Sequence, residues 1–269
     1  MSFSDVLREA VADFAERGYE SEAQLQDWVS RIRSAAEADL VPEDRVEEEV
    51  RRVLGTVYDR MIERGGIFRR HPDVGRFAVE RLRPAARAEL QRAIFASAGL
   101  IRLNRTRAVE ETVQRFAGWA TSVPRGGSEN VRRRDVQVGT RRELQKLAYE
   151  ARRVGVDQGH KFAASLDRIL ADESGAIAGQ WHHHYVRYPR PEHVARDRKW
   201  YVLRAGWAYR DGLIRPIDGN GFLEDHDQAG EKILCRCSVL YRTELGRVPT
   251  EMLTGKGRRM LESARQRVA

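Results

Sequence analysis

The only two cysteines of this 269-residue chain, Cys235 and Cys237, are two positions apart. They lie within a mainly apolar run, and the pattern predicts a buried β-strand over residues 233–241. Side chains at positions i and i+2 lie on the same face of a strand. We therefore expect both sulfur atoms to point to one side of this segment and Arg236 to point to the other.

The paired cysteines predict either a metal site or a packed core strand. Two thiolates with the imidazoles of His193 and His226 would form a tetrahedral ligand set for zinc. In the alternative, both cysteines are small buried apolar residues. An extended C-x-C segment holds its Cβ atoms too far apart for an easy disulfide, so we expect reduced thiols and an intracellular compartment.

A second group of polar and aromatic residues follows Trp181. His182 and His184 would share one face of a strand, which allows two metal ligands, although stacking of these rings beside neighbouring aromatic residues is the simpler interpretation. The aromatic residues Trp200, Tyr201, Trp207 and Tyr209 could stack on bases, but we expect them to fill the core of a small sheet.

The charge of the chain is unevenly distributed. The net charge is +8, but residues 1–60 carry 8 basic and 15 acidic side chains, a net of −7, so residues 61–269 carry +15. Only five of the 48 basic residues are lysines. Arginine binds phosphate and carboxylate groups with two hydrogen bonds. The balance therefore indicates a polyanionic partner, although a soluble, arginine-rich surface would have the same composition.

Five arginines are the candidate phosphate contacts. Three of them come shortly after the Gly- and Ser-containing segment 122–128, and two more come a little later. No recognised DNA-binding motif accompanies them, so we expect non-specific contacts with double-stranded DNA, or else a solvated charged surface. These residues are Arg132, Arg133, Arg134, Arg141 and Arg142.

No apolar run approaches the roughly 18 residues that a membrane-spanning helix needs. The beginning of the chain, Met1–Asp5, is followed by an acidic amphipathic segment and not by an apolar leader. We therefore expect neither a secretory leader nor a membrane partner.

The first part of the chain has the apolar periodicity of amphipathic helices. Gly18 is expected to end the first helix, and Ser21 with Gln24 forms a capping-box pattern at the start of the second. Pro42 is expected to begin a third helix, and the two glycines at 65–66 are expected to end it. These local signals predict helices at defined positions before residue 70.

Later helices are less regular in pattern. Pro84 is expected to separate short helical segments, and a further helix is expected over residues 106–119. A longer helix is expected over about residues 138–171, where Gly155 and Gly159 would permit close packing at a cost of ~1 kcal/mol each relative to Ala.

After Gly175 the pattern changes to short β-rich segments, expected at 182–187, 200–204 and 206–210, with Asp211 and Gly212 as a hairpin turn. The expected fold class is α+β, with a mainly helical N-terminal region followed by a compact α+β module that contains a small antiparallel sheet. The expected organisation is a helical region at 1–121, a linker at 122–137, the α+β module at 138–248, and a helix with a basic tail at 249–269.

The module at about 140–245 resembles the phage head morphogenesis, or Mu F-like, minor capsid family. A helix with small and polar residues is followed in order by a Trp, an Arg, a His, a loop with glycine and proline, and a closing C-R-C. The matching residues in this chain are Trp181, Arg187, His193, Gly212, Pro216, Cys235, Arg236 and Cys237. Arg187 could be a surface cation or could pair with a buried acid, and the position of the matching residue in the family favours a structural salt bridge.

The resemblance implies a non-enzymatic structural role. Members of this family are minor proteins of tailed-phage heads that act in capsid assembly with the portal, or travel with the packaged genome. It implies the portal protein or the major capsid protein as partners, several copies in each particle, and packaged double-stranded DNA nearby. The implied location is the capsid interior or portal vertex of the virion, after assembly in the host cytoplasm.

Two alternatives come from other functional classes. Asp225, His226 and Asp227 together with the cysteines bear a faint likeness to a metal-dependent nuclease centre, in which a metal ion stabilises the leaving oxygen. A free, non-specific DNA-binding protein with no particle partner would also have this charge balance. No P-loop, dinucleotide-binding or serine-hydrolase motif is present.

Overall fold

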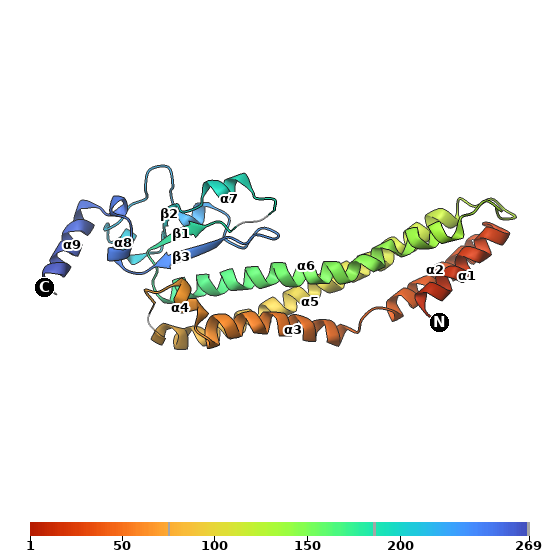
Figure 1. Cartoon of the computed structure of the whole chain (residues 1–269), viewed down its shortest axis with the longest axis horizontal. Coiled ribbons are helices and arrows are strands. Elements are labelled where there is room, and N and C mark those ends of the chain that lie inside the picture. Colours follow the sequence, from red (N-terminus) through yellow and green to blue (C-terminus); the bar gives the residue numbers. More distant parts are fainter. Residues whose placement is uncertain (75, 185–186, 268–269) are drawn as a thin grey trace. The chain divides into compact units, whose positions relative to one another are not determined.

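The computed structural model describes residues 1–74, 76–184 and 187–267, without the side chains of residues 76–78. Of the described residues, 66% are helical and three strands form an antiparallel sheet, which confirms the expected α+β class (Figure 1). The helices are α1 (Phe3–Arg17), α2 (Glu22–Ala38), α3 (Glu43–Tyr58), α4 (Gly66–Arg70), α5 (Arg76–Ala120), α6 (Arg133–Glu173), α7 (Pro191–Ala195), α8 (Trp207–Arg210) and α9 (Gly255–Gln266). The strands are β1 (Ala178–His182), β2 (Trp200–Val202) and β3 (Ser238–Arg242).

The chain divides into two compact units. The first unit consists of residues 1–50 and 96–154, and the second of residues 51–95 and 155–269. Helices α3, α5 and α6 therefore each contribute residues to both units. The division does not follow the expected linker at 122–137, because helical segments on both sides of it belong to the first unit.

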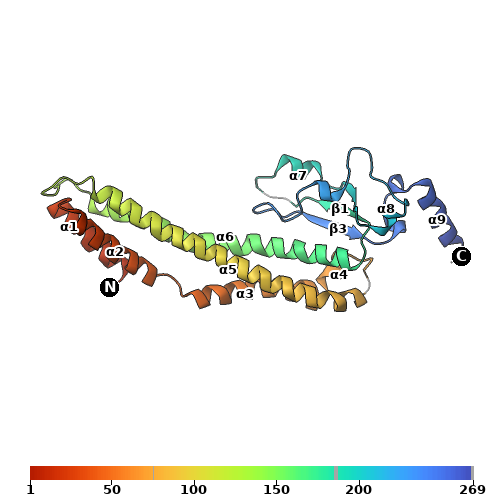
Figure 2. The same ribbon diagram turned by 180° about the vertical axis from the view of Figure 1, so that it is seen from behind.

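The core of the first unit is formed by α1, α2 and the later part of α5. Helices α1 and α2 lie side by side (Figure 2). Gly18 ends α1 with a φ of 75°, as predicted. Half of the predicted capping box is present: the Ser21 hydroxyl accepts the N–H of Gln24, but the Gln24 side chain accepts the N–H of Glu20 at 3.0 Å. The fully buried side chains of Phe14, Ile32 and Phe116 lie at the centre of this core.

The segment that follows α5 is a tight turn against the end of α1 and not an extended linker. The N–H of Gly126 donates to the carbonyl of Arg17 at 2.8 Å, and the N–H of Ser128 donates to that of Ala15 at 2.9 Å. Gly127 has a φ of 80°, and a Cβ atom there would lie 2.4 Å from the Ala15 oxygen. Only glycine fits this approach, so the composition that suggested a linker has a packing cause.

The expectation that Pro84 separates two helices is wrong, because α5 is one helix of 45 residues with Pro84 inside it. Proline removes the hydrogen bond to the carbonyl of Glu80. Both Pro84 and Glu80 are exposed, so water can solvate this carbonyl, while Leu82 and Ala86 are fully buried and hold the helix against the core. Although α5 and α6 are long, no helix in the described part of the chain is both long and apolar enough to span a membrane.

The second unit joins the sheet to the later part of α6 and to the segment that contains α4. The strand order is β2-β1-β3, and all pairs are antiparallel. Ideal Cβ atoms at Gly155 and Gly159 on α6 would lie 4.0 and 3.8 Å from the side chains of Val53 and Val57 on α3. These are ordinary van der Waals distances, so an alanine would also fit at either position and the packing of α6 on α3 does not depend on glycine.

Three expected strand segments differ from the structure. β1 ends at His182, and the rest of the expected 182–187 strand falls partly on Tyr185 and Val186, which lie outside the described residues. The expected 206–210 strand is the short helix α8, which Gly212 follows with a φ of 67°. The 233–241 strand is reduced to β3, because Leu234 adopts a φ of 57° that interrupts an extended segment.

Candidate metal centre

The side chains of His193, Cys235 and Cys237 meet in the second unit. His193 lies on the five-residue helix α7, where it is only 2% exposed. The cysteines lie in the irregular segment directly before β3 and are 2% and 6% exposed, whereas Arg236 between them is exposed. The prediction that both sulfurs point to one side and Arg236 to the other is thus confirmed, although this segment is not part of the strand.

The two sulfur atoms face the same ring nitrogen of His193. Its Nδ1 atom lies 3.5 Å from Sγ of Cys235 and 3.4 Å from Sγ of Cys237, and the three candidate ligand atoms all lie within 4.8 Å of one another. A tetrahedral zinc ion with ordinary Zn–S and Zn–N bonds separates a sulfur ligand from a nitrogen ligand by about 3.5 Å. The donor set, two sulfurs and one imidazole, suits zinc.

Asp227 fixes the orientation of the His193 ring. Its Oδ2 atom lies 2.9 Å from Nε2 of His193, and its Oδ1 atom lies 2.5 Å from a guanidinium nitrogen of Arg196. A carboxylate at Nε2 keeps the proton on that nitrogen, so the lone pair of Nδ1 faces the sulfurs. A histidine that ligates a metal usually has such a carboxylate or carbonyl partner on its other nitrogen.

The partners of Asp227 lower the pKa of its carboxyl group. Burial alone would raise it, but the hydrogen bonds from Arg196 and His193 outweigh burial and lower it below the ordinary value. The carboxylate is therefore ionised at neutral pH and can accept the proton on His193 Nε2. Asp227 was expected only as a member of a nuclease-like group, and its role beside His193 had no sequence signal.

The two thiols affect each other strongly. The hydrogen bond with Cys237, with support from backbone N–H groups of Cys237 and Gly230, outweighs burial and lowers the pKa of Cys235 to about 5. The same hydrogen bond, together with burial, raises the pKa of Cys237. One thiolate is therefore ready at neutral pH, and metal binding must displace the proton from the second thiol.

Trp181 closes the site above His193. The two rings are 5.6 Å apart between centroids and meet at 82°. The Nε1–H of Trp181 is buried and has no hydrogen-bond partner among the described residues, yet it is near enough to Cys237 to favour a thiolate there. An unsatisfied buried donor costs ~1–3 kcal/mol. A thiolate at Cys237, as in a metal complex, would give this N–H an acceptor.

His226 does not belong to the ligand group, which corrects the fourth predicted ligand. Its ring packs edge-to-face against Tyr201 at 5.0 Å, and its Nε2 lies 3.4 Å from the carbonyl oxygen of Asn220. His182 and His184 are also elsewhere, where they face Gln180 and Ser238 at 3.1 and 2.9 Å.

Arg187 and Pro216 contribute nothing to the site directly. Arg187 is exposed, and its guanidinium carbon lies 5.4 Å from the ring centroid of Tyr188. It makes no ion pair with any residue that the structure describes, so the salt bridge expected for it is wrong. Pro216 is half-buried in a loop. It lies two residues after Ile214, which forms an isolated β-bridge with Leu253.

The candidate phosphate contacts lie around the start of α6 in the first unit. Arg132, Arg134 and Arg142 are exposed. Arg133 is paired with Glu16 at 3.1 Å, and Arg141 is half-buried with an unpartnered Nε atom. Three of the five are thus available to an anion.

A second buried histidine has no counterpart in the sequence predictions. Nε2 of His71 lies 3.0 Å from Oδ1 of Asp167 on α6, and the other oxygen of Asp167 lies 2.8 Å from Arg70. The N–H of Tyr241 on β3 donates to Nδ1 of His71 at 3.3 Å. Both nitrogens of this ring are satisfied by the protein, so His71 joins α6 to the sheet and has no free nitrogen for a metal.

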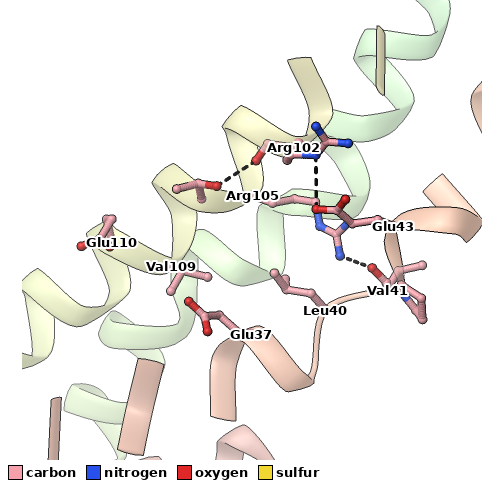
Figure 3. A pocket seen from close by; sticks show the side chains of 10 residues that line it. Glu37, Leu40, Val41, Glu43, Arg102, Arg105, Val109 and Glu110 are labelled. Carbon is pink, nitrogen blue, oxygen red and sulfur yellow. Dashed lines mark hydrogen bonds and ion pairs between the residues drawn. The ribbon is translucent and has the colours of Figure 1, made fainter. Parts of the chain in front are cut away.

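The first unit also contains a cavity of about 310 Å³ between the α2–α3 connection and α5. Figure 3 shows Arg102 turned toward Glu43 and Arg105 toward the carbonyl of Val41. Glu37 and Glu110 also line it. Because its two arginines already have partners within the wall, the cavity gives no clear preference for an anion or a cation.

Comparisons with known proteins give no relatives. No family model, no curated protein and no solved structure matches this chain.

Proposed function

We propose that this chain is a non-enzymatic minor head protein of a tailed phage or a related particle, with a C-terminal module held together by zinc. The observation that carries the proposal is the meeting of His193, Cys235 and Cys237 beside Trp181, at sequence separations of 42 and 44 residues from the histidine to the cysteines. These are four of the residues on which the resemblance to the Mu F-like family rests.

Zinc in this site would have a structural role. His193, Cys235 and Cys237 would hold it, and Asp227 would keep the His193 ring in place. When bound, the ion would join α7 to the segment before β3 and so supply cohesion to a small module. The burial of all three ligands supports a closed structural site, since a catalytic ion needs a position that substrate can reach.

The proposed partners are the portal or major capsid protein and the packaged DNA. Helix faces of the first unit would bind the protein partner through buried apolar contacts, and exposed arginines would contact DNA phosphates without sequence preference. The acidic first 60 residues and the basic remainder suit partners of opposite charge. We place the chain in the capsid interior or at the portal vertex, in several copies.

The test is to locate the chain in particles that contain it. Mass spectrometry of purified particles, with cryo-electron microscopy of the portal vertex, should find the chain at or near the portal ring. Co-expression with the portal protein should yield a complex, and removal of residues 1–50 should weaken it. Absence of the chain from particles, together with no complex with portal or capsid protein, would contradict the proposal.

A second candidate function is metal-assisted hydrolysis of nucleic acid. The observation that favours it is the count of three protein ligands, since a zinc ion with three protein ligands keeps one position for water. Incubation of the zinc-loaded protein with plasmid DNA distinguishes the two functions. Cleavage that disappears in Cys235→Ser would favour the enzyme, whereas intact plasmid favours the structural role.

A further inference from the structure

Helix α9 is a strongly basic, exposed element of the second unit. Together with its C-cap residue Arg267 it carries five basic side chains and one acidic side chain, a net charge of +4. Every one of these charged residues is exposed. Arg258, Arg259, Arg265 and Arg267 form no ion pair with any residue in the described ranges, so their charges are free to meet an anion.

The helix is attached to the module through a narrow contact near its start. Gly257 is buried, and a Cβ atom there would lie 2.1 Å from the carbonyl oxygen of Leu213. The side chain of Leu261 packs on the core next to it. Thr254 caps the helix, since its hydroxyl accepts the N–H of Gly257 at 3.1 Å. The stripe of Gly257 and Leu261 therefore fixes the helix and leaves its other faces to solvent.

The first turn of α9 has an unfavourable charge arrangement in the free protein. Lys256, Arg258 and Arg259 lie near the N-terminal end, and the first turn has no acidic side chain. The helix dipole is positive at this end and repels cations there. An anion at the same position would interact favourably with both the dipole and the side chains. The charge pattern thus favours a bound anion.

We infer that α9 is a nucleic-acid-binding surface, on which the guanidinium groups of Arg258, Arg259 and Arg265 contact backbone phosphates. A membrane surface suits it less well, because an interfacial helix needs several large apolar residues on one face. Met260 is the only large apolar side chain of α9 that is mostly exposed, at 50%. An acidic protein partner would also need an apolar anchor, which this face lacks.

This inference rests on the proposed function. It assigns the main contact with DNA to α9 instead of to the arginines at the start of α6. The test measures binding of the full-length protein to a labelled DNA duplex by fluorescence anisotropy over a series of salt concentrations. One variant combines Arg258→Gln, Arg259→Gln and Arg265→Gln. A charge-matched control combines Arg132→Gln, Arg134→Gln and Arg142→Gln, which removes the same three charges from exposed positions of the first unit.

The α9 variant should lose at least about tenfold in affinity at low salt, and the slope of log affinity against log salt should fall by about 3, or about one for each phosphate contact. The control variant should lose about threefold or less. Equal losses in both variants, or a larger loss in the control, would overturn the assignment to α9. Unchanged zinc content and circular dichroism show that both variants remain folded.

Two further outcomes separate this inference from the proposed function. Salt-independent binding, or no binding, of DNA by the native protein would end the inference, while a complex with portal protein would still support the particle role. Stronger binding to vesicles that contain anionic lipid than to DNA would instead overturn the choice of nucleic acid. DNA binding through α9 without any particle partner would support the inference and contradict the particle role.

Discussion

His71 and His193 are both buried, and both face an aspartate that is also held by an arginine. Asp167 and Arg70 accompany His71, and Asp227 and Arg196 accompany His193. The distances from Nε2 to the carboxylate, 3.0 and 2.9 Å, are nearly equal. In both clusters of the second unit, an aspartate that also pairs with an arginine satisfies Nε2 of the buried histidine.

The difference lies at Nδ1. In His71 this nitrogen accepts the backbone N–H of Tyr241, whereas in His193 it faces two cysteine sulfurs. The first ring is complete without any ligand and can only hold elements together. The second has a lone pair directed at two thiols, one of which is already acidic. The partner of the second nitrogen therefore decides whether a buried histidine is structural or ready to bind a metal.

The largest effect should come from removal of the sulfur ligands. Cys235→Ser with Cys237→Ser should lose bound zinc, and the module should melt at a lower temperature than the native protein, because binding energy of a structural zinc is folding energy, ~10–16 kcal/mol in small zinc domains. Metal analysis and calorimetry would measure both effects. Retention of zinc by this double variant would place the ion elsewhere.

The next largest effect should come from His71→Leu, which leaves Asp167 and Arg70 without their buried partner. Breaking a buried ionic cluster costs about 3–5 kcal/mol, so the free energy of unfolding in denaturant should fall by this amount while zinc content remains unchanged. His193→Leu is the matched variant and should lose both stability and zinc. Loss of zinc from His71→Leu as well would show that the two clusters are not separate.

A smaller effect is expected for Asp227→Asn, which keeps the shape of the side chain and removes its charge. Loss of such a partner typically weakens metal affinity about 10–100-fold, and competition with a chromogenic chelator would measure this change. Asp225→Asn is the matched control, because Asp225 is exposed and pairs with Arg204 at 2.5 Å. Equal affinity in the Asp227 variant and the native protein would contradict the positioning role.

A further effect concerns pH in the zinc-free protein. Folding lowers the pKa of Cys235 from its ordinary 9.0 to about 5. The stabilisation that the folded thiolate provides is therefore complete above pH 9.0 and declines as the pH falls toward about 5. Ultraviolet absorbance of the thiolate should show one step near the lower value, and Cys237→Ala should move it upward. No thiolate at neutral pH would be the contrary result.

Local signals predicted a large part of this fold. The cap formed by Ser21 and the glycine at position 18 depend on neighbours in the sequence, and the structure has both. The alternation of buried Cys235, exposed Arg236 and buried Cys237 follows from their i, i+1, i+2 spacing, and the structure has it although the segment lies outside β3. Features that depend only on neighbouring residues in the sequence can thus be predicted without a structure.

Long-range partners were not predictable in the same way. His71 and Asp167 are 96 residues apart, and nothing near either residue indicates the other. The choice of His226 as a ligand followed sequence proximity, whereas the fold turns that ring to Tyr201 and brings Asp227 to His193. Pro84 was expected to end a helix, but buried neighbours on either side keep the helix continuous. Tertiary packing decides each of these cases.

Zinc-edge X-ray absorption of the purified, unmodified protein tests the account most directly. It should show one zinc ion for each chain with two sulfur ligands and at least one imidazole nitrogen, as the positions of Cys235, Cys237 and His193 require. Two results would contradict the account. One is purified protein that lacks stoichiometric metal and whose two thiols both react freely. The other is a zinc ion with only oxygen and nitrogen ligands.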